Sequence, residues 1–215
     1  MRTVAAAALD MVSIQEYDDR HMTTVKAGSK KEETRERIVR AAARALRQHG
    51  YEGVGVADVM KEAGLTHGGF YAHFESRDAL LAAAADQARA ESIGDLAREI
   101  SASKPGQELM ALVDAYLSDW HLAAPEQGCA VAAAGTEVPR QDAEVRRVAS
   151  RSIKDLIGLI ERQFPDWGRN AAHEKATGIA ATLVGAVVLA RAVDNTQLSN
   201  RIRRAARELV RATAS

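Results

Sequence analysis

Cysteine, proline and aromatic residues are scarce in this sequence. A single cysteine stands among 215 residues, with four prolines and 4% aromatic side chains. One cysteine cannot form an intramolecular disulfide, which fits the reducing cytoplasm, where we expect the protein to act. An excess of one charge is also missing, because 29 basic residues balance 29 acidic ones. Any surface for nucleic acid must therefore be a local patch.

Long hydrophobic runs are scarce as well. The first nine residues are too short and too mixed for a secretory signal. Residues 1–29 show no lasting periodicity and are predicted to be a flexible extension, with Met11 and Met22 as alternative starts. Gly178–Ala190 is apolar almost all the way round, but a membrane span needs about 20 such residues. We expect this helix in the interior or at a subunit interface, and no membrane partner.

The patterns of several enzyme classes are missing. His173-Glu174 lacks the second histidine that a zinc-protease helix needs, and no glycine-rich phosphate loop follows a strand. The other histidines lack metal-ligand spacing. Acidic residues at helical spacing, such as Glu91 and Asp95, are interpreted as a solvated face. We expect no catalytic residue, metal or cofactor; a helical-bundle enzyme or a protein-binding adaptor is the alternative.

Alanine and helical periodicity are abundant, so the predicted fold class is all-α. Glycine or proline ends most of the periodic segments, for example Gly50 and Pro165. Ser76 is a plausible N-cap for a long helix that runs toward Ile100. The remaining predicted helices are Lys31–His49, Val56–Ala63, Gln107–His121, Cys129–Val138, Ala143–Phe164 and Gln197–Ala212.

The most informative segment is GLTHGGFYAHF at 64–74, followed by ESRDALL at 75–81. Together with Val56–Ala63 it forms two short helices around an Ala-Gly-Leu corner. This is the helix-turn-helix pattern, which places its second helix in the major groove of DNA. Glycines at 68 and 69 cost helix stability, about 1 kcal/mol each relative to alanine. Close approach of the backbone to DNA would explain them, although a short packed helix could also tolerate them.

The words GGFYAHF and SRDALL, at this spacing, closely resemble the operator-binding domain of TetR/AcrR-type transcriptional regulators. The resemblance covers roughly 34–81. After the flexible extension at 1–29, it implies a helix-turn-helix DNA-binding domain at 30–77 and a helical domain for effector binding and dimerisation at 78–215. Such a protein is a ligand-responsive regulator, more often a repressor than an activator.

The predicted DNA contacts fall into two groups. The short helix offers none of the side chains that make the most discriminating base contacts, so specificity should depend on His67, on Thr66 and on DNA shape. The resemblance places phosphate contacts at the start of the first helix of the DNA-binding domain and near the end of that domain. The predicted DNA-binding residues are Thr34, Arg35, Lys61, Thr66, His67, Gly68, Gly69, Tyr71, His73 and Arg77.

One position departs from the family pattern. TetR-like chains usually have threonine or serine just before the second helix, where the hydroxyl caps the helix and can meet a phosphate. Val54 and Gly55 stand there instead. Gly55 can still serve as a modest cap, but we expect this phosphate contact to use the backbone or to be missing.

The resemblance also implies partners: a palindromic double-stranded operator, a second copy of the chain, and a small-molecule effector. The best candidates for the dimer interface are Ala143–Phe164 and Ala171–Val193. Ordinary core packing is the alternative for every residue proposed to line the effector pocket. These candidates are Met110, Tyr116, Trp120, His121, Cys129, Phe164 and Trp167.

Cys129 carries a separate hypothesis. It follows Gly128 at the predicted first turn of a helix, where the positive end of the helix dipole favours a thiolate. An electrophile- or oxidant-sensing repressor is therefore an alternative to control by a reversibly bound ligand. A small, half-buried structural residue is the competing interpretation.

Overall fold

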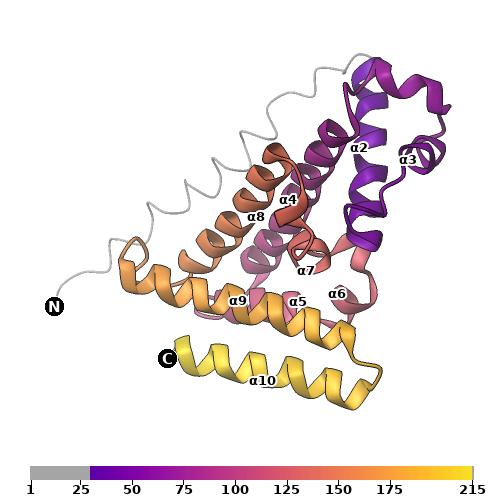
Figure 1. Cartoon of the computed structure of the whole chain (residues 1–215). Helices are drawn as coiled ribbons and strands as arrows, with labels where there is room; N and C mark the ends of the chain where they lie inside the picture. The colour runs from indigo at the N-terminus through magenta and orange to yellow at the C-terminus, as the bar shows by residue number, and fades with distance from the viewer. Residues whose placement is uncertain (1–29, 215) are drawn as a thin grey trace.

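A computed structural model of the chain describes residues 30–214 (Figure 1). The predicted extension at 1–29, with its alternative starts, lies outside these residues. Helices and turns make up the described part, in which no strand occurs, and this confirms the predicted all-α class. A small head of helices at one corner joins a larger helical body through one long shared helix (Figure 1).

The head consists of α2 (Lys30–His49), α3 (Val56–Glu62) and the 3-10 helix η1 (His67–Ala72). Gly50 and Gly64 end α2 and α3, each at a φ of +74°, a conformation that side-chain-bearing residues rarely adopt. Both turns therefore depend on glycine. The core of the head is apolar and fully enclosed, and includes Ile38, Leu46, Met60 and Phe70.

The shared helix is α4 (Arg77–Ala102), whose 26 residues span about 39 Å. The predicted N-cap is confirmed, because the Ser76 hydroxyl accepts a hydrogen bond from the Ala79 amide at 3.1 Å. The first half of α4 packs into the head's core as far as Ala88, and the second half packs into the body's core from Ile93. Movement of α4 must therefore affect both parts.

The body contains two interrupted segments and three long helices. The predicted helix over 107–121 is wrong in its continuity, because Ser118 ends α5 and starts α6. The Ser118 hydroxyl accepts the His121 amide at 3.1 Å and caps the second piece. The predicted helix over 129–138 is likewise split. The elements are α5 (Glu108–Tyr116), α6 (Asp119–Ala123), η2 (Pro125–Gln127), α7 (Ala130–Ala134), η3 (Val138–Arg140), α8 (Ala143–Glu161), α9 (Asn170–Ala192) and α10 (Thr196–Ala214).

By length and hydropathy alone, α9 could cross a membrane. In the fold it lies between α8 and α10 and contacts both (Figure 1). One face of α9, including Leu183 and Val187, is part of the body's core. Its apolar character is thus explained by packing inside a helical body, with a second face left open.

Candidate nucleic-acid interface and effector pocket

The start of η1 is open to the outside. Thr66 precedes it in extended conformation, and Thr66, His67 and Gly68 are all exposed. A Cβ built on Gly68 would touch nothing within 4 Å, and one on Gly69 would touch just the Met60 methyl at 3.6 Å. Neither glycine has the positive φ that would require it. The fold itself therefore does not need glycine at these two positions.

Aromatic packing fixes the orientation of η1. Phe70 is buried and its ring stacks on Phe74 at 5.8 Å between centroids. Tyr71 packs edge-on against Phe70 at 5.2 Å, yet it stays 74% exposed. The buried pair anchors the helix to the head, while the Tyr71 hydroxyl is presented to solvent.

Four of the predicted phosphate-binding residues lie at the surface of the head. The Arg35 guanidinium stacks over the Phe74 ring at 4.9 Å, and half-buried His73 lines the same groove. Lys61 is exposed in the last turn of α3. The Thr34 hydroxyl donates to the Lys30 carbonyl at 2.7 Å, so it already has one partner inside α2.

Arg77 has a different environment from the one predicted. Its guanidinium donates to the carbonyl oxygens of Val54 at 3.2 Å and Tyr51 at 2.5 Å. These bonds tie the start of α4 to the loop between α2 and α3. Arg77 is thus a residue that positions the head, and phosphate contact by its remaining donors is still a prediction.

The start of α3 is capped as the sequence indicated. Gly55 is the N-cap in extended conformation, without a side-chain cap. The structure adds Asp58, whose Oδ2 lies 2.8 Å from the place of a Cβ on Gly55. Its carboxylate interacts favourably with the N-terminal end of the helix dipole. A negative charge therefore stands near the place where the family pattern has a hydroxyl.

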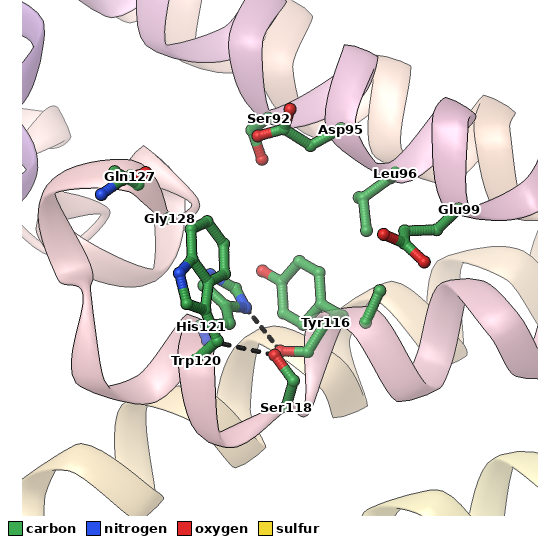
Figure 2. Close-up of a pocket in the computed structure, with 11 residues that line it drawn as sticks. Ser92, Asp95, Leu96, Glu99, Tyr116, Ser118, Trp120, His121, Gln127 and Gly128 are labelled. Atoms are coloured by element: carbon green, nitrogen blue, oxygen red, sulfur yellow. Dashed lines mark hydrogen bonds between the residues drawn. The ribbon is translucent and has the colours of Figure 1, made fainter.

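A cavity of about 310 Å³ lies between the second half of α4 and the α5–α6–η2 segment (Figure 2). Three of the predicted pocket residues come together there: Tyr116, Trp120 and His121. Cys129 is buried and borders a smaller cavity next to Tyr116. The remaining lining residues are Ser92, Asp95, Leu96, Glu99, Ala115, Ser118, Gln127 and Gly128.

The other three predicted residues lie elsewhere. Met110 packs on the apolar core of the body, and Phe164 is buried within it. Trp167 is 54% exposed in the turn between α8 and α9. None of the three lines the cavity.

Sequence reasoning missed the acidic side of the cavity. Glu91 and Asp95 do not form a plain solvated face: Glu91 pairs with the buried Arg47 at 2.6 Å, and Asp95 lines the cavity together with Glu99. One signal was available. Acidic residues stand at 91, 95 and 99, each four residues after the one before. Like charges at this spacing destabilise an isolated helix.

The His121 side chain lines the cavity and also contacts the backbone of Cys129. Its Nδ1 lies 2.5 Å from the Tyr116 carbonyl oxygen, and its Nε2 accepts the Cys129 amide at 3.0 Å. These two bonds require the neutral ring with its proton on Nδ1. Burial lowers the pKa of His121, and the nearby Arg191 adds to this effect, although the bond to Tyr116 opposes it.

The cavity wall contacts the head directly. Both η2 and α7 pack against α2 near its C-terminal end (Figure 1). In addition, Glu137 accepts the Glu52 amide at 3.1 Å, which joins the head's first loop to the body. A ligand that shifts η2 would therefore press on the head through α2 as well as through α4.

The fold and the exposed helix-turn-helix define a DNA-binding regulator of transcription. The sequence model of the family described as "Bacterial regulatory proteins, tetR family" matches residues 38–84. The chain is 32% identical over 166 residues to the "Uncharacterized HTH-type transcriptional regulator Rv0196" of Mycobacterium tuberculosis, covering 73% of this chain and 84% of that protein. It is 23% identical to the HTH-type transcriptional regulator LmrA of Bacillus subtilis, covering 76% and 89%.

Solved structures show the same architecture. A TetR transcriptional regulator from Chloroflexus aurantiacus has a TM-score of 0.71 at 26% identity, over 86% of this chain and 97% of that one. The reduced form of Escherichia coli NemR also reaches a TM-score of 0.71, at 19% identity, over 85% and 97%. The chain belongs to the TetR family of transcriptional regulators, and its function is regulation rather than catalysis.

Proposed function

We propose that this chain is a cytoplasmic repressor that binds a palindromic operator as a homodimer and is released by a small-molecule effector. The main support for DNA recognition by η1 is the open glycine pair at 68 and 69. Internal packing and backbone conformation do not require it. A surface that must let another backbone come close explains it.

In this arrangement η1 enters the major groove. Thr66 and His67 face base edges, and Tyr71 contacts the sugar-phosphate backbone. Arg35, Lys61 and His73 flank the helix and contact phosphates, so they hold the register without reading sequence. If each subunit makes about three ionic phosphate contacts, the log-log salt dependence of operator affinity should have a slope near −5.

Competition binding tests this division of roles. The operator can be sought as an inverted repeat in the DNA that flanks the coding region, and binding can then be followed by fluorescence anisotropy. His67→Ala should weaken the operator far more than random DNA, whereas Arg35→Ala should weaken both. Equal losses with His67→Ala would remove this residue from base readout, and a salt slope near zero would contradict DNA binding by this surface.

A single short helix reads few base pairs, so useful specificity needs two copies related by a two-fold axis. The open face of α9 and its neighbour α10 supports the dimer. Large apolar side chains are exposed there, including Val188, Leu189, Leu198 and Leu209. The open face of α8 is strongly basic, with Arg146, Arg147 and Lys154 exposed, and would repel its own copy. We therefore place the interface on α9 and α10 rather than on α8 and α9.

Sedimentation equilibrium tests the dimer. Leu189→Glu should yield monomers that keep their helical content and lose operator affinity. Ile153→Glu changes an exposed apolar residue of α8 in the same way and serves as the control. A monomeric wild type would contradict the homodimer.

The effector acts if it prefers the conformation that fits DNA poorly. The cavity beside α4 supports this role, since α4 belongs to both cores. Control through the Cys129 thiol has less support, because the side chain is buried and the α7 that follows has five residues. Operator release by a mild oxidant that persists in Cys129→Ser would eliminate it.

A further inference from the structure

We propose that the cavity between α4 and the α5–α6–η2 segment selects an organic cation with apolar substituents. This inference rests on the proposed effector-controlled function and adds the chemical class of the effector. It depends on the charge of the lining, on the exposed ring of Trp120, and on the weakly satisfied hydroxyl of Tyr116.

The charge of the lining is negative. Asp95 and Glu99 lie one helical turn apart on α4, and the lining includes no lysine or arginine. Asp95 pairs with Arg98, a side chain that is itself 74% exposed and outside the lining. Among the described residues Glu99 forms no salt bridge. A ligand in the cavity would therefore meet at least one carboxylate without a protein cation.

The pair with Arg98 does not offset the cost of burying the Asp95 carboxylate. Burial raises the pKa of Asp95 above its ordinary value; Glu91 and Glu99 raise it further, and Arg98 and Arg47 oppose them without reversing the shift. The surroundings thus make a negative charge on Asp95 less favourable than it would be in water. A ligand cation would relieve this, and a ligand anion would aggravate it.

An exposed aromatic ring completes the surroundings for a cation. Trp120 lines the cavity and is 54% exposed, so its ring is available to a ligand (Figure 2). The Tyr116 ring lies opposite α4, with its hydroxyl pointing into the space between the helices (Figure 2). Aromatic faces attract ammonium groups and apolar substituents alike.

The Tyr116 hydroxyl is the independent sign of a ligand. The side chain is 1% exposed, and within residues 30–214 the hydroxyl meets the Cys129 thiol, a weak hydrogen-bonding group, without the geometry of an ordinary hydrogen bond. Burial raises the pKa of Tyr116 well above its usual value, so the group stays neutral. A buried hydroxyl whose neighbour is a weakly bonding thiol is under-satisfied, which is costly, and the N–H of an ammonium could satisfy its oxygen.

Other classes of ligand fit less well. Arg191 donates to the His121 carbonyl at 2.5 Å but does not line the cavity, and neither does any other arginine or lysine, so an anion finds no cation in the lining. A metal ion needs several oxygen ligands, and the described residues contain no cluster of three metal-binding side chains. A neutral compound would gain nothing from the carboxylates of Asp95 and Glu99.

The experiment compares three probes of similar shape and different charge: 4-phenylbutylammonium, 4-phenylbutanol and 4-phenylbutyrate. The full chain with Trp167→Phe retains Trp120, one of the protein's two tryptophans, as a fluorescent reporter in the cavity. The ammonium should quench Trp120 saturably and bind about tenfold more tightly than the alcohol, a factor expected for a partly exposed ion pair with aromatic contact. The carboxylate should bind least.

Asp95→Asn combined with Glu99→Gln should abolish the preference for the ammonium and leave the alcohol's affinity within about twofold. Glu174→Gln, an exposed carboxylate on α9, is the matched control and should change nothing. Equal affinity for ammonium and alcohol, or a preference that survives the double substitution, would overturn the inference.

Operator release, measured separately, distinguishes the two proposals. Selective binding of the ammonium without release from DNA supports the selectivity of the cavity and contradicts the effector-controlled function. Release by the alcohol or the carboxylate, but not by the ammonium, supports that function and overturns the cationic class. If no probe binds saturably, the inference fails on its own.

Discussion

The guanidinium of Arg47, near the end of α2, lies 2.6 Å from the carboxylate of Glu91 on α4. The Arg47 side chain is almost completely buried, and its Nε and Nη1 have no other partner within the described residues. Gln87 donates to the second carboxylate oxygen at 2.9 Å and fixes its direction. One buried ion pair thus connects the DNA-binding head to the helix that lines the cavity.

Glu91→Gln should destabilise the protein by about 3 kcal/mol, because it leaves the buried Arg47 charge without a counter-ion. Urea unfolding followed by circular dichroism measures the loss. Glu36→Gln breaks an exposed pair with Arg40 on α2 and should cost no more than about 0.5 kcal/mol. Equal effects of the two substitutions would mean that the Arg47 pair contributes no more than a surface contact.

Gly68→Ala should separate DNA binding from folding. An alanine here meets no atom within 4 Å and removes freedom from the unfolded chain, so stability should stay or rise by about 0.4–1 kcal/mol. Operator affinity should fall at least about tenfold, because the methyl group would stand between the backbone and the DNA. Gly158→Ala on α8 is the control and should stabilise without affecting DNA. Unchanged operator affinity would mean that η1 does not approach DNA at this point.

The helix boundaries show what the sequence could and could not predict. The stop at Gly50 and the cap at Ser76 were predictable, because local backbone chemistry decides them. The break at Ser118 was not, since the apolar period of Val113, Tyr116 and Leu117 runs up to it and no glycine or proline marks it. Its cause is a capping bond combined with the ring of His121, which reaches back to Tyr116.

The site residues can likewise be divided into those that the sequence could predict and those that it could not. A local motif predicted the exposed residues of the head, since a helix-turn-helix is a contiguous segment. The cavity is assembled from α4 and the 115–128 region, so its lining depends on tertiary packing. Sequence reasoning placed Trp120 there but missed Asp95. Arg77 shows what a local motif leaves out, because its guanidinium also donates to two carbonyl groups of the first loop, and its phosphate contact stays a prediction.

Asp58→Asn should strengthen binding to operator and random DNA alike. The carboxylate lies at the start of α3, where the family pattern has a hydroxyl near a phosphate, and its removal takes away a repulsion. We expect a gain of about three- to tenfold at low salt that shrinks as salt screens the charge. Glu174→Gln, on the body, should leave the affinity unchanged. A weaker complex would show that Asp58 positions α3 more than it repels DNA.

His121 gives stability a dependence on pH whose direction follows from its bonds. In the fold its Nε2 accepts the Cys129 amide and therefore cannot carry a proton. Burial lowers its pKa below the ordinary value of 6.5, so in this range the unfolded state binds the proton more readily than the folded state. The contribution is fully present above about pH 6.5 and is lost as the pH falls toward the lower, folded-state value.

The free energy of unfolding in urea should consequently decrease between pH 7 and pH 5.5. His121→Gln supplies amide groups in place of the ring nitrogens and cannot titrate, so this variant should be less stable at pH 7 and should show a smaller decrease. His173, an exposed histidine whose Nδ1 lies 2.8 Å from Glu161, provides the comparison. His173→Gln should keep the decrease of the wild type. If His121→Gln retained it too, the proton would bind elsewhere, and the neutral ring between Tyr116 and Cys129 would not be what acid disrupts.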